Sequence, residues 1–407
     1  MGALKGLVVS LVILGPHFTI AAQKPAAVLP PSTGTVTGHV TCSDTQRFAR
    51  FADVYLLPKA QQTGGPRAKG SEEKPTVMLV QGRTALDGSF TIHDLQPGDY
   101  YAIAHARGYV IPLVADDNLS KEDAYRSNPD LSKAFANFPV VHVVADRTAN
   151  VELTMQRGGV IAGHALFDDG TPVSGMFIEV SREDGKDPAK QYLGGVFYSV
   201  NIEDDRVLTD DEGHYRVTAL APGKYIVSML IWPEMNERTV GTSQTWGAAG
   251  GGIRQSFTVY SPGGFRKSEA KTVEIKRDER REDTDIEVKL GGLRTVRGRL
   301  LGGEDHHPIN HGTASLKDGT DFEQLAAVLP DGTFHFNYVP EGTYELSVRD
   351  AADAKMSEDM RHWEEPIHMY DNAKQTVIVA EHDVVVDDIQ LPDKKTDKAA
   401  SSGDMPQ

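Results

Sequence analysis

Short runs that alternate apolar and polar side chains recur along the chain, and the clearest of them belongs to a unit that occurs three times. The unit consists of a glycine turn, an alternating run, a second glycine ten residues after the first, and a tyrosine two residues later. Alternation at period two is typical of a half-buried β-strand, because successive side chains point to opposite faces of the sheet. The copies run from Asp87 to Tyr100, from Asp211 to Tyr225 and from Asp331 to Tyr344.

Each copy contains two turns with different requirements. Gly88, Gly213 and Gly332 stand where a hairpin would pass through positive φ, which glycine adopts at least cost. The Pro97-Gly98 and Pro222-Gly223 pairs fit a type II turn, in which proline fixes φ and glycine takes the reversed conformation. The unit therefore predicts strand, turn and strand three times over.

Further strands extend the repeat on both sides. An opening strand precedes each copy, and a closing pair of valine-rich strands follows it. The turn glycines are 125 and 119 residues apart. So long a period, with about seven short strands in each copy, predicts three tandem domains of one kind. We expect an all-β chain of seven-stranded antiparallel β-sandwiches, prealbumin-like or Ig-like, at residues 34–157, 158–291 and 292–392.

The two ends of the chain differ from this pattern. Residues 1–22 hold one lysine, a short apolar run and small residues before Gln23, which indicates a secretory signal peptide. The run is too short and interrupted to predict a membrane span, and none is expected in the mature chain. Cys42 is the only cysteine, so no internal disulfide can form, and we expect it to fill a strand. The prediction is an extracytoplasmic bacterial protein, periplasmic, envelope-bound or secreted, with a disordered tail at residues 393–407.

The charge is negative and unevenly distributed. The formal net charge is −16, and counting by segment gives about −1, −6 and −11 for the three expected domains. Because no basic stripe is present, neither nucleic-acid binding nor attraction to an anionic membrane surface is expected.

The order of these motifs resembles a known family. V-x-G-x-V, then D-G-x-F, then L-x-P-G-x-Y, then a closing V-x-L is similar to the carboxypeptidase regulatory-like domain, and the segment from Tyr260 to Phe265 resembles the closing segment of secreted bacterial members. The resemblance implies a transthyretin-like sandwich grouped with folds used by carbohydrate-binding modules. It also implies an accessory, non-catalytic role, since the catalytic zinc of the enzymes that give the family its name belongs to another domain.

Candidate chemistry is sparse. His362 and Glu365 have the H-x-x-E spacing of two zinc ligands, with His368 nearby, but a metal site needs at least three ligands in fixed geometry. We expect a solvated turn at the histidines from Glu304 to His311, with zinc or nickel binding as the alternative. We expect the same at the acidic residues 204–205 and 210–212, with calcium binding as the alternative. No nucleophile elbow or phosphate loop is present. We expect no catalytic residue, no metal site and no cofactor.

Different insertions separate the tyrosine strand from the closing strands in each copy, at residues 118–138, 235–265 and 351–371. Such insertions on a rigid sandwich are common binding sites. In the second of them Trp246, Tyr260 and Phe265 are the predicted ligand-binding residues. The sequence thus predicts a non-catalytic binding or scaffold protein whose partner is a carbohydrate or an envelope protein. The alternative is an accessory part of a carboxypeptidase-type hydrolase, or a weak metal-dependent one.

Overall fold

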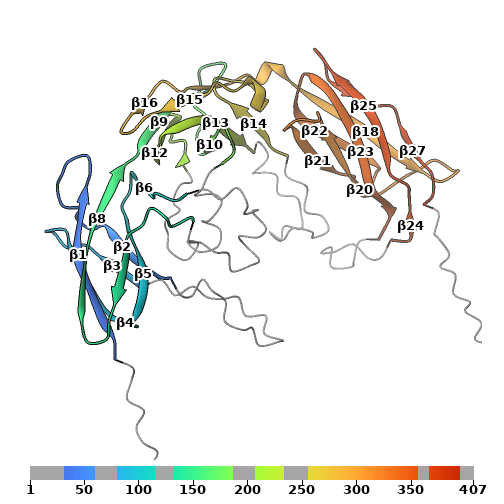
Figure 1. The fold of residues 1–407 in the computed structure, drawn as a ribbon. Helices are drawn as coiled ribbons and strands as arrows, with labels where there is room; N and C mark the ends of the chain where they lie inside the picture. The colour runs from blue at the N-terminus through green and yellow to red at the C-terminus, as the bar shows by residue number, and fades with distance from the viewer. Residues whose placement is uncertain are drawn as a thin grey trace, which may run out of the picture.

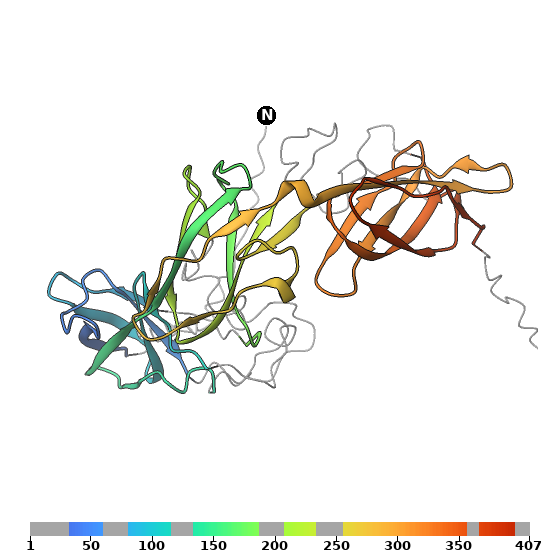
Figure 2. The same cartoon turned by 90° about the horizontal axis from the view of Figure 1, so that it is seen from above.

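The computed structural model describes residues 32–59, 80–114, 133–186, 207–232, 255–355 and 366–394. Their strands form six sheets, which fall into three successive groups of two along the chain (Figure 1, Figure 2). We call these groups the first, second and third sheet pair. Apart from two three-residue 3-10 turns, all regular structure in the described residues is strand, so the all-β prediction is confirmed.

The first sheet pair places β4-β1-β8-β6 in one sheet and β3-β2-β5-β7 in the other. Its strands are β1 (Gly34–Cys42), β2 (Asp53–Pro58), β3 (Val80–Arg83), β4 (Ser89–Leu95), β5 (Gly98–His105), β6 (Tyr109–Val110), β7 (Val140–Val143) and β8 (Thr148–Arg157).

The second sheet pair places β12-β9-β16 in one sheet, with β17 also on β9, and β11-β10-β13-β14 in the other, with β15 on β13. Its elements are β9 (Gly159–Phe167), β10 (Phe177–Arg182), β11 (Val207–Leu208), β12 (His214–Leu220), β13 (Gly223–Ile231), β14 (Phe257–Tyr260), η3 (Lys267–Glu269), β15 (Val273–Ile275), β16 (Arg280–Arg281) and β17 (Ile286–Val288).

The third sheet pair repeats this plan, with β19-β18-β22 in one sheet, where β26 and β27 also pair with β18, and β21-β20-β23-β24 in the other, where β25 pairs with β23. Its elements are η4 (Leu290–Gly292), β18 (Leu293–Gly302), β19 (His307–Pro308), β20 (His311–Lys317), β21 (Glu323–Ala327), β22 (Thr333–Pro340), β23 (Gly342–Asp353), β24 (His368–Met369), β25 (Ala373–Val379), β26 (Val384–Val385) and β27 (Ile389–Leu391).

The repeated turns do not form hairpins, and that part of the prediction is wrong. Gly88, Gly213 and Gly332 do have positive φ, at 80°, 78° and 81°. However, each follows a strand of one sheet and precedes a strand of the other, as between β3 and β4. The turn therefore carries the chain across the sandwich, because period-two alternation marks a half-buried strand without saying which sheet it joins.

The predicted type II turns at Pro97-Gly98 and Pro222-Gly223 are also wrong. Such a turn needs a φ of about +80° at its glycine, but Gly98 has a φ of 153° and Gly223 is not among the residues with positive φ. The reversed conformation is found four residues earlier, at Asp94, Ala219 and Tyr338, with φ of 60°, 60° and 58°. At each of these residues the register with the neighbouring strand shifts, as between Val217 and Leu220 on β12. Every copy thus carries a β-bulge at the same place.

One sheet of each pair is mixed, whereas the described pairings of the other are all antiparallel. The first strand of each pair runs parallel to the last, as β1 does with β8 from Thr35–Thr148 to Cys42–Met155. The same holds for β9 with β16 and β17, and for β18 with β26 and β27. Parallel neighbours need a crossover connection, and here the intervening strands supply it by crossing between the two sheets.

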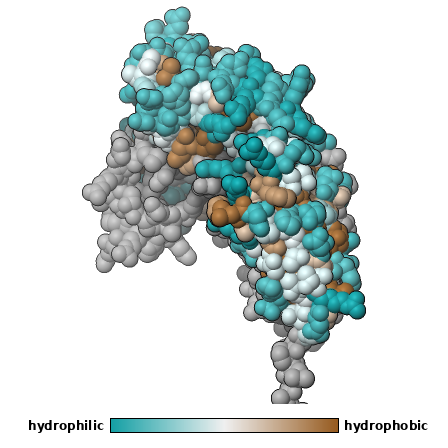
Figure 3. Space-filling view, turned by 90° about the vertical axis from the view of Figure 1, so that its left-hand side faces the viewer, coloured by the Kyte–Doolittle hydropathy of each residue, from teal (hydrophilic) through white to brown (hydrophobic). Residues whose placement is uncertain are grey.

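Apolar side chains fill the space between the sheets. The first sheet pair has its own cluster, to which both of its sheets contribute and in which Cys42 is buried. The second and third pairs share one continuous cluster. The face shown in Figure 3 is correspondingly mostly hydrophilic, with small, separate hydrophobic patches. Among the residues described, none forms a helix with the length and apolar character needed to cross a bilayer.

Side chains also join the second pair to the third. Arg266 donates from Nε to Asp318 Oδ2 at 2.7 Å, and from Nη2 to the Tyr344 hydroxyl at 3.0 Å and the Glu341 carbonyl at 3.1 Å. Gln255 donates to the His335 carbonyl at 2.5 Å and accepts from Asn337 N at 2.7 Å. We call this set of contacts the joint. It combines hydrogen bonds with the shared apolar cluster, so it fixes the two sheet pairs against each other.

Candidate functional site

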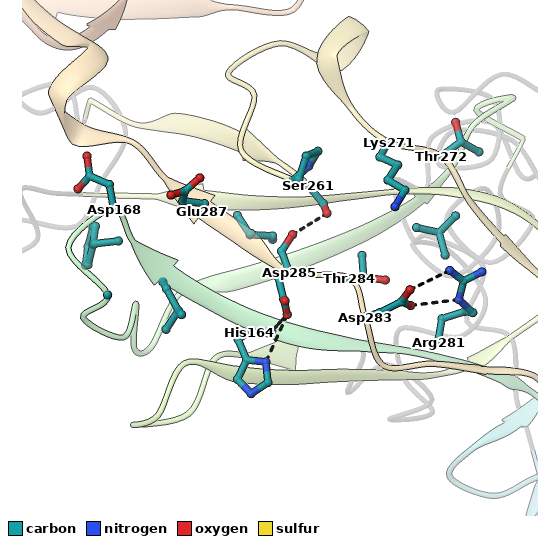
Figure 4. A pocket seen from close by; sticks show the side chains of 16 residues that line it. His164, Asp168, Ser261, Lys271, Thr272, Arg281, Asp283, Thr284, Asp285 and Glu287 are labelled. Atoms are coloured by element: carbon teal, nitrogen blue, oxygen red, sulfur yellow. Dashed lines mark hydrogen bonds and ion pairs between the residues drawn. The ribbon is translucent and has the colours of Figure 1, made fainter.

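A cavity of about 490 Å³ lies on the second sheet pair. Its walls are the end of β9, residues 261–262, residues 271–273 and the closing segment from Arg281 to Glu287 (Figure 4). It is built from the first and last strands of one sheet and from the connection that follows β14 in the other.

Buried contacts hold the closing segment on β9. The Tyr215 hydroxyl donates to the Thr284 carbonyl, and burial raises the pKa of that phenol. Gly163 lies so close to the same carbonyl that a β-carbon there would be 2.1 Å from the oxygen. Thr284, Ile286 and Val288 are buried, so the alternate residues Asp285 and Glu287 are exposed. The wall of the cavity is therefore fixed by the fold.

Asp285 connects three parts of the wall. Its Oδ1 accepts from the His164 backbone N–H at 2.8 Å and lies 3.3 Å from His164 Nδ1. Its carbonyl accepts from Ser261 Oγ at 2.7 Å. Figure 4 shows Asp285 between the two partners. These bonds join β9, the closing segment and the connection after β14.

The rest of the lining contains both positively and negatively charged side chains. Arg281 donates from Nε and Nη2 to the two carboxylate oxygens of Asp283, at 3.1 Å each, and this guanidinium holds the pKa of Asp283 below its usual range. Lys271 is exposed on the opposite wall, and Asp168 and Glu287 add carboxylates. The apolar part of the lining consists of Leu166, Phe167, Pro262, Val273 and Ile286. The cavity thus combines an apolar surface with many hydrogen-bond donors and acceptors.

The side chains of the cavity are not arranged for nucleophilic catalysis. Ser261 donates its hydroxyl proton to a backbone carbonyl, and His164 Nδ1 faces Asp285. A catalytic serine instead donates to a base. The absence of a catalytic residue stays a prediction.

The predicted ligand-binding residues lie in different places. Trp246 lies outside the described residues. The Tyr260 hydroxyl donates to Asp321 Oδ2 of the third sheet pair at 2.6 Å, and the Phe265 ring lies 6.1 Å from that of Phe257, next to the shared apolar cluster. Both residues thus belong to the joint, and their role in ligand binding stays a prediction.

The polar clusters noted in the sequence have partners within the fold. His307 lies 2.6 Å from Asp305 Oδ1 and 2.9 Å from Asp353 Oδ2, and the Tyr370 hydroxyl donates to the same Asp353 oxygen at 2.5 Å. Asp210 accepts from the N–H groups of Glu212 and His214, at 3.0 and 2.8 Å. His362, Glu365 and residues 204–205 lie outside the described residues. Within the described ranges no three ligand-type side chains are grouped as a metal ion requires.

Sequence reasoning missed Lys271, Asp283 and Asp285 as candidate binding residues. The available signal was the alternation from Asp283 to Val288, in which acidic side chains alternate with Thr284, Ile286 and Val288. That pattern predicts the strand and its exposed face. It does not predict that Ser261 and Lys271, from a distant connection, face the same space.

No family model and no curated protein matches the chain. Solved structures match with low scores. The Bacillus anthracis TIE protein is 14% identical with a TM-score of 0.20, over 89% of this chain and 51% of its own, so the chain spans about half its length. The streptococcal ancillary pilin is 10% identical with a TM-score of 0.28, over 89% of this chain and all of its own. A shaft pilin of Lactobacillus rhamnosus is 9% identical with a TM-score of 0.19, over 92% and 100%. These likenesses assign neither a family nor a function, and the resemblance to the carboxypeptidase regulatory-like domain stays a prediction.

Proposed function

We propose that this chain is an exported, non-catalytic binding and scaffold protein, in which each sheet pair is a domain with the bounds expected from the repeat. The second and third pairs act as one stiff unit that presents the cavity of the second pair to an extracytoplasmic ligand. The cavity is the observation that carries the proposal, because it is concave, its walls are fixed by buried contacts, and its polar groups converge.

The chemistry of the lining favours a neutral, polyhydroxylated ligand, which means a carbohydrate. Asp168, Asp283, Asp285 and Glu287 outnumber the two cations of the lining, so an anionic ligand would be repelled. A hydroxyl group can donate a hydrogen bond to a carboxylate and accept one from a charged donor, and both kinds of bond are strong. The half-buried Phe167 supplies the apolar surface on which a sugar ring packs.

Binding of the full chain to an array of neutral and acidic oligosaccharides tests the proposal. We expect selective binding of neutral glycans, and at least a tenfold loss of affinity when Lys271→Ala and Asp283→Asn are combined. Lys374→Ala is the matched control, because Lys374 is an exposed lysine paired with Glu345 at 2.8 Å on the third sheet pair. No binding to any glycan, or equal binding of the pocket variant and the control, would refute the carbohydrate assignment.

The role of Trp246 is tested by a separate variant in the same assay. If its side chain stacks on the sugar, Trp246→Ala lowers the affinity for the glycan, and it lowers it further when combined with the pocket substitutions. Equal binding of wild type and Trp246→Ala would remove that residue from the site and leave the cavity. The alternative function, a carboxypeptidase-type hydrolase or an accessory part of one, relies on His362 and Glu365 and gains no support from the described residues.

A further inference from the structure

Three large apolar side chains are exposed together at one end of the first sheet pair. Phe48, Phe51 and Leu86 are 55%, 56% and 67% exposed. The first two lie in the connection between β1 and β2, which projects as a blue loop in Figure 1, and Leu86 lies in the turn before β4. The segments touch, since Phe51 N donates to the Thr84 carbonyl at 3.2 Å and Phe48 packs against Gly88.

The connection is held rigidly although its side chains face outward. Thr84 is buried, and its hydroxyl donates to the Ala49 carbonyl at 2.7 Å and accepts from Ala52 N at 2.8 Å. Ala49 and Ala52 are themselves buried, so the residues between and beside them point away from the core. Exposure of Phe48 and Phe51 is thus a fixed property of the loop.

Phe51 also has a backbone conformation that phenylalanine disfavours, with φ at 57°. The second sheet pair has a glycine at the equivalent position. Gly175 N donates to the Thr209 carbonyl as Phe51 N donates to the Thr84 carbonyl, and Gly175 has a φ of 73°. The two residues occupy equivalent positions. Neither packing nor backbone geometry accounts for a phenylalanine at position 51. Strain of this kind in the backbone often marks a functional position.

Phe48 departs from the repeat in the same way. It packs against the turn glycine Gly88, where Pro172 and Pro308 pack against Gly213 and Gly332 in the other two pairs. Two compact prolines thus stand where the first pair has an exposed aromatic ring.

Arginines surround these rings in a chain that is otherwise acidic. Arg47 and Arg50 are exposed, and no described carboxylate lies within 4.0 Å of either. Arg83 lies over the Phe51 ring at 5.9 Å and 3.6 Å from Asp53. The charge count of the whole segment hides this arrangement, in which Asp53, paired with Arg83, and Asp87, next to Leu86 in the chain, are the acidic neighbours. We call the set of Arg47, Phe48, Arg50, Phe51, Arg83 and Leu86 the Arg-Phe tip.

We propose that the Arg-Phe tip docks the protein on an anionic phospholipid surface. Arginine side chains pair with lipid phosphates, and exposed rings on a loop insert at the level of the headgroups. A protein partner would need a broad matching surface, and a stable interface buries about 800 Å² on each partner. Three apolar side chains on a small projecting tip suit a fluid bilayer better. This inference does not depend on the carbohydrate proposal.

Vesicle co-sedimentation of the full chain tests it. We expect binding to vesicles that contain phosphatidylglycerol and none to vesicles of phosphatidylcholine alone. Arg47→Gln with Arg50→Gln, and Phe48→Pro with Phe51→Gly, should each lower binding at least tenfold. Phe48→Pro copies the residue that both other sheet pairs have at this position, and Phe51→Gly copies that of the second pair, so the unfolding midpoint of this variant in urea should equal or exceed that of wild type. Ile378→Ser on β25 is the control. Ile378 is 68% exposed and lies outside the tip, so this substitution should leave vesicle binding unchanged.

Three outcomes would overturn the proposal. One is absence of binding to anionic vesicles, and another is binding that neither tip variant reduces. The third is self-association of wild type that both tip variants abolish without any vesicle binding, which would assign the tip to a second copy of the chain.

Discussion

Three tyrosines occupy the same position at the start of β5, β13 and β23, and each closes the turn before it with the same bond. Tyr100, Tyr225 and Tyr344 donate to the carbonyl four residues earlier, at 2.8, 2.6 and 2.6 Å. All three are buried, and burial raises the pKa of Tyr344 to about 12. The hydroxyl therefore satisfies a carbonyl at the point where the chain changes sheets, as in the tyrosine corner of other β-sandwiches.

Removing one of these hydroxyls should destabilise its sheet pair. Tyr225→Phe leaves the Ala221 carbonyl without its partner, which costs about 1–2 kcal/mol of unfolding free energy. Urea unfolding checks the value. Tyr338→Phe, which removes a tyrosine hydroxyl at a half-buried residue outside these turns, is the control. Equal midpoints for Tyr225→Phe and wild type would contradict this role.

His307 should titrate above the ordinary histidine value of 6.5. Hydrogen bonds that the ring donates to Asp305 first and Asp353 second raise the pKa of His307 in the folded chain. A raised folded-state pKa means that this stabilisation is fully present below pH 6.5 and is lost as pH rises through the folded-state pKa. Titration of the ring by NMR measures the pKa directly, and Asp305→Asn should lower it. A wild-type pKa at or below 6.5 would contradict the described contacts.

At the scale of elements, the parallel contact between first and last strands depends on close approach. Gly38 faces the Val151 carbonyl and Gly163 faces the Thr284 carbonyl, so that built β-carbons would lie 1.8 and 2.1 Å from those oxygens. A side chain at either residue would push the closing strand away. Glycine is needed here for space rather than for its φ.

Gly163→Ala should therefore destabilise the second sheet pair by about 3 kcal/mol, as overpacking in a closely packed sheet does. It should also weaken glycan binding, because the displaced segment forms a wall of the cavity. Gly292→Ala is the matched control, since a β-carbon there has no atom within 4 Å. Thermal unfolding together with the binding assay measures both effects. If Gly163→Ala leaves both the thermal stability and the glycan affinity at their wild-type values, the strands are not held this closely.

The positions of the strands are predictable from the sequence because alternation is a local pattern. The pairing of the strands is not predictable in this way. Phe90 and Ile92, or Phe334 and Phe336, face the core as expected. The sheet that each strand joins depends on contacts far along the chain, so the local pattern at Gly88 and Gly213 predicts a hairpin where the chain in fact crosses between sheets. The sequence does not reveal the bulges, because Ala219 and Tyr338 are not residues that signal positive φ and Asp94 alone belongs to a type enriched there. The cavity was missed because it combines segments from both sheets, and Tyr260 and Phe265 proved to lie at the joint.

At the scale of the whole molecule, the joint determines whether the chain is a string of separate modules or a scaffold with a stiff part. Asp318 is 5% exposed as a side chain. Although burial alone would raise its pKa, hydrogen bonds from Thr320 and Arg266 lower the pKa of Asp318. Without Arg266 the carboxylate is left buried and without its cation, which is strongly destabilising in comparable pairs, by about 3–5 kcal/mol.

Calorimetric unfolding of the full chain tests the central claim most directly. We predict two transitions for wild type, one for the first sheet pair and one for the second and third together, because only the latter share an apolar cluster. Arg266→Ala should lower and broaden or split the second transition, while Arg281→Ala, which removes an exposed ion pair, should leave it single. Three independent transitions in wild type, or an Arg266→Ala trace identical to wild type, would contradict the account.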